Sequence, residues 1–501
     1  MLSILNEEAS ETLKPHYINM FKIFSRILSD LSNLKSAFYV LSCLKSIIPY
    51  TDEVELNDLM NLLPHGVNAS IKIIKTDQNE ETVTKIFDFF QSLIEYDIPM
   101  VTSYIKNLAL MVLEFIADTT LLNPTRICAM NFLNVLIETQ KASLLKSDMV
   151  RPIVSSIFEI MCKSEHPLQT KSNIEAMLED MGNNDEEEVD DTENLFTNAT
   201  QVLDYCALYF PAKKFITVLI DYVSPAVVSP EAMNRRAALA ALAITSEGCA
   251  DYYRNHHMEL LIDLCLKGML DESVPVVQLG YFALCQFSEY LQPNFSQYSD
   301  RVMRHLIQTI ESKAELLTIS RMTIRFYDAL QSVCENLGEA LIPFLPDLMG
   351  QLMKLQNKCE YDYKSQRLII STFSSIVCST KSDFNPYFDC VVEIIKPYLS
   401  YTKTPASNDS KLIQIECIDL MGVFAKFIGK EKFSDALTED CLNFVQNILN
   451  NDNDPEIRSG AYDLLAGLTN KLKENVNLKL IMPQILETLK SEEGINVTSF
   501  L

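Results

Sequence analysis

The feature that most constrains the fold of this sequence is a helical phrase that returns at a regular interval. A stretch ending at Ser246-Glu247 is echoed 42 residues later at Ser288-Glu289, and again 46 residues later at Cys334-Glu335. A period of about 40 to 47 residues is typical of HEAT repeats, whose unit is an antiparallel pair of helices. One such pair cannot bury its apolar face alone, so neighbouring pairs must stack.

The repeat continues in both directions when one position in the second helix of each unit is aligned. Successive positions lie 39 to 49 residues apart, except for one jump of 70 residues. Nine of the ten positions are apolar, which is the pattern expected of a shared core. The jump predicts an insertion of about 26 residues between the third and fourth positions. The aligned positions are Leu41, Phe90, Leu133, Leu203, Leu242, Leu284, Leu330, Ser374, Met421 and Leu465.

The apolar residues within each unit follow a helical period, and no comparable stretch alternates as a strand would. Phe215, Val218, Leu219 and Tyr222, for example, form one helical stripe. We therefore predict an all-α fold, a right-handed, superhelical α-solenoid of ten or eleven HEAT repeats. The expected divisions are N-terminal repeats in residues 1–167, an acidic insertion loop in 168–195 and C-terminal repeats in 196–501.

The charge balance favours basic protein partners. The chain has 42 basic and 67 acidic side chains, a net charge of −25, which disfavours direct binding to nucleic acid. Its 13 cysteines are scattered without a C-x-x-C pair, so structural thiols in a reducing compartment are expected. The longest uncharged apolar stretch, near residues 108–113, is too short to insert into a membrane. The sequence thus predicts a soluble intracellular protein.

The predicted insertion contains a dense run of carboxylates. Seven occur in nine residues, and their mutual repulsion predicts a solvated loop. Two interpretations remain open. The loop is an inert, solubilising insertion, or it holds Lys/Arg-rich segments through weak, salt-sensitive contacts. The seven residues are Asp185, Glu186, Glu187, Glu188, Asp190, Asp191 and Glu193.

A second set of carboxylates recurs with the repeat itself. Glu247, Glu289 and Glu335 occupy the same phase of three successive units. They form either an acidic ladder on the concave, second-helix side or a set of side chains that only satisfies solvation and packing.

Catalytic motifs are missing from the sequence. It contains no Gly-rich phosphate loop, no G-x-S-x-G and no H-E-x-x-H. The adjacent His256 and His257 would point about 100° apart on a helix, which disfavours a shared metal. We expect no catalytic residue, cofactor or metal site and no enzymatic activity. An enzyme would require a cluster of titratable residues in one pocket, which the sequence does not indicate.

Four stretches resemble one known family. Residues 264–293, LCLKGMLDESVPVVQLGYFALCQFSEYLQP, resemble the HEAT unit of the importin-β (karyopherin-β) superfamily. Residues 203–214 (LDYCALYFPAKK), 38–50 (FYVLSCLKSIIPY) and 491–495 (SEEGI) are similar to the same family. The resemblance covers essentially the whole chain and is most specific in its middle.

The resemblance implies a nuclear import receptor that shuttles between cytoplasm and nucleus through the nuclear pore. It implies basic cargo such as histones and ribosomal proteins, which Ran-GTP releases. In this superfamily, cargo and Ran occupy the inner surface formed by second helices, and first helices meet phenylalanine-glycine nucleoporins. An acidic loop that contacts cargo or Ran recurs in the family, and the matching residues here are Asp185 to Glu193.

The sequence departs from the family pattern in its length. A full receptor has about twice as many repeats, and this chain matches the N-terminal-to-middle part, beginning after the first few repeats. We therefore expect a truncated product, an isoform or an incomplete gene model, with weakened Ran binding. The alternatives are a HEAT scaffold that assembles a phosphatase or similar complex, and a histone-holding chaperone without Ran-controlled transport.

Overall fold

The computed structural model describes residues 13–51, 53–95, 104–164, 195–312, 321–359, 362–399, 408–451 and 455–472. Every regular element in these ranges is a helix, and no strand occurs among them. The chain divides into two compact units, Met1–His257 and Met258–Leu501. The prediction of an all-α fold is confirmed.

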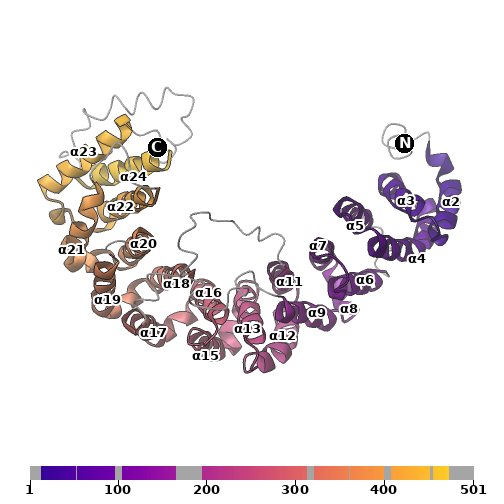
Figure 1. Cartoon of the computed structure of the whole chain (residues 1–501), viewed down its shortest axis with the longest axis horizontal. Helices are drawn as coiled ribbons and strands as arrows, with labels where there is room; N and C mark the ends of the chain where they lie inside the picture. The colour runs from indigo at the N-terminus through magenta and orange to yellow at the C-terminus, as the bar shows by residue number, and fades with distance from the viewer. Residues whose placement is uncertain are drawn as a thin grey trace. The chain divides into compact units, whose positions relative to one another are not determined.

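The first unit contains five antiparallel helix pairs among its described residues (Figure 1). The short helix α8 (Lys141–Lys146) connects the third pair to the fourth, and a second short helix, α14 (Ala250–His256), follows the fifth pair. The pairs are α2 (Tyr17–Ser29) with α3 (Leu34–Ile47), α4 (Glu53–Thr76) with α5 (Glu80–Glu95), α6 (Ile105–Ala117) with α7 (Asn123–Thr139), α9 (Val150–Lys163) with α11 (Leu195–Tyr209), and α12 (Ala212–Ala226) with α13 (Ala232–Ile244).

The second unit also has five pairs in the part of the chain that is described. Short 3-10 turns such as η7 (Asn294–Tyr298) and η9 (Gly338–Phe344) join its successive pairs. The pairs are α15 (Met258–Gly268) with α16 (Val274–Tyr290), α17 (Ser299–Ser312) with α18 (Arg321–Leu337), α19 (Leu345–Lys358) with α20 (Tyr363–Thr380), α21 (Asn385–Ile395) with α22 (Asn408–Phe427), and α23 (Asp435–Asn451) with α24 (Pro455–Leu472).

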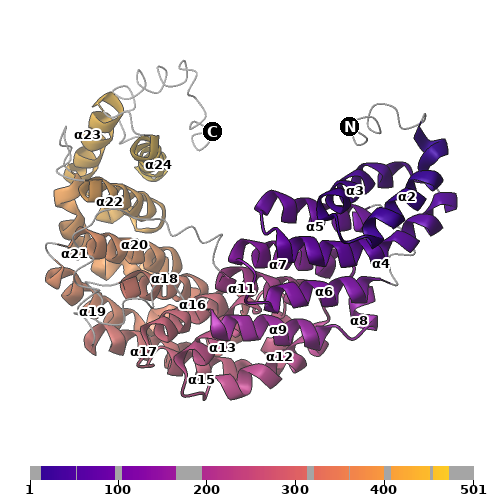
Figure 2. The same cartoon turned by 45° about the vertical axis from the view of Figure 1, so that its right-hand side comes forward.

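Within each unit the second helices pack on one another and form a layer of their own. In the first unit α3 packs on α5, α5 on α7, and α7 on α11, while α2 packs on α4 in the layer of first helices. In the second unit α16, α18, α20, α22 and α24 pack in succession, which Figure 2 shows as a series of neighbouring ribbons. Each unit therefore has a first-helix surface and a second-helix surface.

The aligned positions explain why the pairs stack. All ten lie in second helices, and the nine apolar side chains are at most 1% exposed. Burying one large apolar side chain contributes about 1.5 to 3 kcal/mol, so these positions are a major part of each interface between repeats. The repeat pattern read from the sequence is confirmed.

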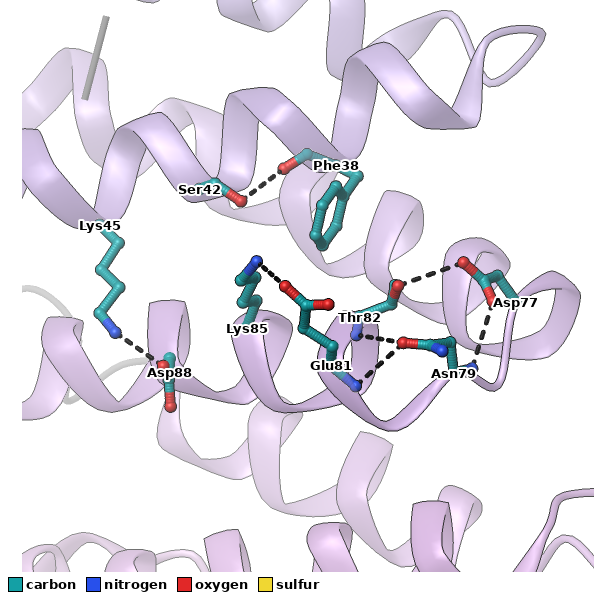
Figure 3. A network of polar contacts seen from close by, with 9 residues as sticks. All are labelled: Phe38, Ser42, Lys45, Asp77, Asn79, Glu81, Thr82, Lys85 and Asp88. Atoms are coloured by element: carbon teal, nitrogen blue, oxygen red, sulfur yellow. Dashed lines mark hydrogen bonds and ion pairs between the residues drawn. The ribbon is translucent and has the colours of Figure 1, made fainter. Parts of the chain in front are cut away.

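The turn from first to second helix is built from local side-chain hydrogen bonds. Between α4 and α5, Asp77 accepts a bond from the Asn79 amide at 3.2 Å and from the Thr82 hydroxyl at 3.2 Å (Figure 3). Asn79 in turn accepts bonds from the amides of Glu81 and Thr82, which cap the start of α5. Similar bonds from an amide two residues on are accepted by Asp30, Asp118, Asp271 and Asp362. These Asx turns fix where each second helix begins.

Ser374, the one polar residue among the ten aligned positions, provides a test of this core. Its hydroxyl is buried and has no hydrogen-bond partner among the described residues. We expect Ser374→Ala to raise the free energy of unfolding by up to about 1 kcal/mol, because an unsatisfied buried hydroxyl carries a desolvation cost. Urea unfolding followed by circular dichroism measures the change.

The adjacent serine is the matched control. The Ser375 hydroxyl donates to Glu335 Oε1 at 2.6 Å, so Ser375→Ala should lower stability by about 1 kcal/mol. A loss of stability in Ser374→Ala as large as that in Ser375→Ala would contradict the conclusion that the Ser374 hydroxyl is buried without a hydrogen-bond partner.

Candidate partner-binding surface

The seven predicted loop carboxylates, Asp185 to Glu193, lie outside the described residues. Their place in the chain is clear, however, because α9 ends at Lys163 and α11 begins at Leu195. The insertion therefore connects the first and second helices of one pair, and these two helices still pack against each other.

A buried arginine contacts a residue at each end of this connection. The Arg236 side chain of α13 is 0% exposed, and its Nη2 donates to the backbone carbonyl of Ser164 at 2.8 Å. Its guanidinium lies 4.0 Å from the centre of the Phe196 ring. Burial lowers the pKa of Arg236 to about 10. Sequence reasoning missed this residue, because Arg235-Arg236 reads as an exposed basic pair.

The structure places all three residues of the predicted ladder at exposed positions, but they do not share one unit. Glu247 follows α13 in a turn of the first unit, whereas Glu289 in α16 and Glu335 in α18 belong to the second. The latter two stand on second helices that pack directly on each other.

The first unit brings further carboxylates to its second-helix surface. Glu138 of α7 is exposed and accepts a hydrogen bond at 2.9 Å from the Tyr209 hydroxyl of α11. Glu138 and Glu247 both lie five residues after an aligned core position, which was a usable signal in the sequence. Asp204 of α11 does not have this spacing from an aligned core position.

Asp204 lies beside Glu247 because the two segments approach very closely. A Cβ on Gly248 would lie 2.5 Å from the backbone carbon of Ala207, so only glycine fits there without a shift of the backbone. Burial, and then repulsion from the Glu247 carboxylate, raises the pKa of Asp204 to about 6.

A related row of exposed or half-buried carboxylates lies on the second helices of the second unit. Burial is the main cause that raises the pKa of Asp328, Glu416 and Asp419, and the nearby Asp463 raises that of Asp419 further. Asp328, Asp419 and Asp463 each lie two residues before an aligned core position. Negative charge thus follows the repeat on this surface.

No group of three or more His, Cys, Asp or Glu side chains suited to a metal ion occurs within the described ranges. None of the helices searched there is long and apolar enough to cross a membrane. Cys206 and Cys334 are buried and Cys285 is half-buried.

The comparisons with known proteins agree with this architecture. Residues 244–419 match a family model described as importin subunit beta-1-like, TPR repeats. Human importin-4 is 27% identical over 501 residues, a match that covers 99% of this chain and 45% of the human protein. Importin subunit beta-3 of Saccharomyces cerevisiae is 22% identical, over 88% of this chain and 39% of the yeast protein.

Solved structures with this fold include two crystal structures of Kap121p. The complex with Pho4p has a TM-score of 0.81 at 20% identity and covers 98% of this chain and 46% of Kap121p. The complex with Nup53p has a TM-score of 0.79, also at 20% identity, and covers 95% of this chain and 44% of Kap121p.

The stacked pairs define an α-helical repeat protein, and the 39 to 49-residue spacing is that of HEAT units. The chain is similar to proteins of the importin-β superfamily. Its relatives are importins and karyopherins, which are transport receptors and not enzymes. The chain spans about half the length of the curated relatives it matches.

The raised pKa of Asp204 predicts how stability depends on pH. Because the folded chain holds this proton more tightly than the unfolded chain, stability falls as the pH rises from about 4 to about 6. Above that range, Asp204→Asn should be more stable than the wild type by about 1 to 2 kcal/mol, a figure reduced for solvent around the half-buried side chain. At pH 4 the wild type and Asp204→Asn should have the same free energy of unfolding.

Urea unfolding at pH 4 and pH 7.5 checks this expectation. Asp221→Asn is the control, because the Asp221 carboxylate is exposed and pairs with Arg151 at 2.6 Å. Asp221→Asn should give no gain in stability at either pH. If Asp204→Asn is less stable than the wild type at pH 7.5, the raised pKa of Asp204 is contradicted.

Proposed function

We propose that this chain acts as a nuclear transport receptor that binds basic cargo, such as histones and ribosomal proteins, on its second-helix surfaces. The observation that carries the proposal is the recurrence of exposed or half-buried carboxylates on these surfaces in a chain similar to the importin-β superfamily. Such a surface attracts Lys/Arg-rich segments and raises their rate of association. The net charge of −25 supports the same class of partner.

In this proposal Ran-GTP displaces the cargo, and the receptor moves between cytoplasm and nucleus by binding phenylalanine-glycine nucleoporins at the pore. The crystal structures of Kap121p with Pho4p and with Nup53p supply an analogy, since Kap121p has this fold. The acidic segment from Asp185 to Glu193 is proposed to contact cargo or Ran. The ladder of Glu247, Glu289 and Glu335 is proposed to contact cargo.

The function is tested by recovering proteins bound to the chain from cytosol, with and without Ran locked in its GTP form. Histones or ribosomal proteins should bind and be displaced by Ran-GTP. Basic proteins that bind but resist Ran-GTP would indicate a histone-holding chaperone. Capture of one folded, salt-insensitive partner and no basic protein would instead indicate the HEAT scaffold.

The acidic segment has its own test. Replacing its seven carboxylates by Ser or Asn should weaken the binding of a core histone by about tenfold at 100 mM salt and flatten the dependence of affinity on salt. Fluorescence anisotropy at several salt concentrations measures both, and circular dichroism checks that helicity is unchanged.

The matched control removes charge from the first-helix surface. Glu159 of α9 and Asp347 of α19 are exposed and belong to first helices, so Glu159→Gln and Asp347→Asn should leave histone affinity within about twofold. Unchanged affinity after neutralisation of the acidic segment would assign that segment an inert, solubilising role.

A further inference from the structure

The first described helix pair has a charge opposite to that of the chain. Residues 13–51 contain five basic side chains and one acidic side chain, whereas the whole chain has 42 basic and 67 acidic side chains. Helices α2 and α3 contain no Asp or Glu, and α4 contains none from Leu59 to its end at Thr76. Positive charge is therefore concentrated locally in a strongly acidic chain.

The basic side chains of α2 share one exposed face of the helix. Lys22 and Arg26 are exposed and lie four residues apart, which places them one turn apart on the same face. Ile23 beside them is 55% exposed. The buried face of the helix carries Tyr17, Phe21, Phe24 and Leu28. The exposed face of α2 thus presents two cations and one large apolar side chain on the first-helix surface.

Helix α4 continues this basic surface. It packs on α2 in the layer of first helices, and the Ser29 Oγ of α2 lies 3.2 Å from the His65 Nδ1 of α4. The Lys72 Nζ donates to the backbone carbonyl of Leu31 at 3.0 Å, which holds this cation beside the end of α2. Two neighbouring repeats of one compact unit therefore bring basic side chains together.

No described carboxylate neutralises Lys22 or Arg26. Elsewhere in the layer of first helices, Arg151 of α9 pairs with Asp221 of α12 at 2.6 Å, whereas Lys22 and Arg26 form no ion pair with a residue that the structure describes. Asp30, which follows α2, accepts a hydrogen bond at 3.1 Å from a backbone amide two residues on. The exposed face of α2 is therefore left with uncompensated positive charge.

This combination is complementary to an acidic segment that also carries an apolar side chain. Its carboxylates would pair with the cations, and its apolar side chain would cover Ile23. A nucleic acid would extend beyond this small surface over a chain whose net charge is −25, and would be repelled there. An uncharged segment would leave the cations desolvated without compensation. The observations therefore favour an acidic protein segment.

We propose that Lys22, Ile23 and Arg26 of α2, with His65 and Lys72 of α4, bind an acidic segment of a partner protein. This proposal goes beyond the proposed function and does not depend on it, because it concerns the first-helix surface and a partner of opposite charge. An acidic protein bound here leaves the second-helix surfaces of the same chain free for a basic one.

The test uses the full chain and a fluorescein-labelled octaglutamate peptide, followed by fluorescence anisotropy between about 50 and 200 mM salt. Because the chain is acidic as a whole, this peptide binds only where positive charge is concentrated. The double variant Lys22→Gln with Arg26→Gln should weaken binding by about three- to tenfold at the lowest salt and flatten the dependence of affinity on salt. Arg26→Glu alone should also weaken binding, because it replaces attraction by repulsion.

The matched control is Lys106→Gln with Lys213→Gln. It removes the same charge from exposed positions on the first helices α6 and α12, and should leave octaglutamate affinity within about twofold. The apolar contact is tested with a peptide of eight glutamates and two central leucines. This peptide should bind more tightly than octaglutamate, and Ile23→Ser should remove that difference.

The outcomes separate this proposal from the proposed function. If octaglutamate does not bind the wild type at the lowest salt, or binds the Lys22/Arg26 double variant equally well, the acidic-partner surface is wrong and histone binding is untouched. If a single-stranded octanucleotide binds more tightly than octaglutamate and loses affinity in the same variant, the class of partner is wrong. A selective loss of octaglutamate affinity in this variant, with histone affinity within about twofold of the wild type, supports the proposal.

Discussion

Burial of apolar side chains between neighbouring repeats is the interaction on which the rest of this structure depends. A single helix pair exposes too much apolar surface to fold alone, and stacking removes that surface from water. Nine aligned second-helix residues, from Leu41 to Leu465, are at most 1% exposed, and the second helices that carry them pack on one another. The period of the sequence is therefore the period of the core, and each unit grows by adding pairs in the same register.

The same register decides where the polar side chains of the second-helix surfaces lie. Glu138, Glu247, Glu289 and Glu335 each follow an aligned core position by five residues. When the aligned residue is buried between repeats, the glutamate five residues later lies at an exposed position. Asp328, Asp419 and Asp463 repeat at another phase, two residues before the core position. A binding surface with repeated negative charge thus results directly from stacking, without a pocket of conventional shape.

Much of this account was available from the sequence, because its decisive signals are local or periodic. The ten second helices, the place of the insertion and the exposed positions of Glu247, Glu289 and Glu335 could all be predicted from spacing. The sequence did not indicate the role of Arg236 or the proximity of Asp204 to Glu247. Those contacts join residues about 40 to 70 positions apart and depend on close backbone approach, such as that of Gly248 to Ala207.

The measurement that tests the central claim most directly is zero-length carbodiimide cross-linking of the chain to a core histone, with the joined residues identified by mass spectrometry. The reagent joins a carboxylate only to an amine in direct contact with it. The account predicts links from histone lysines to carboxylates of the second-helix surfaces, including Glu138, Asp204, Glu247, Glu289 and Glu335. Links confined to first-helix carboxylates such as Glu159, Asp221 and Asp347 would contradict it.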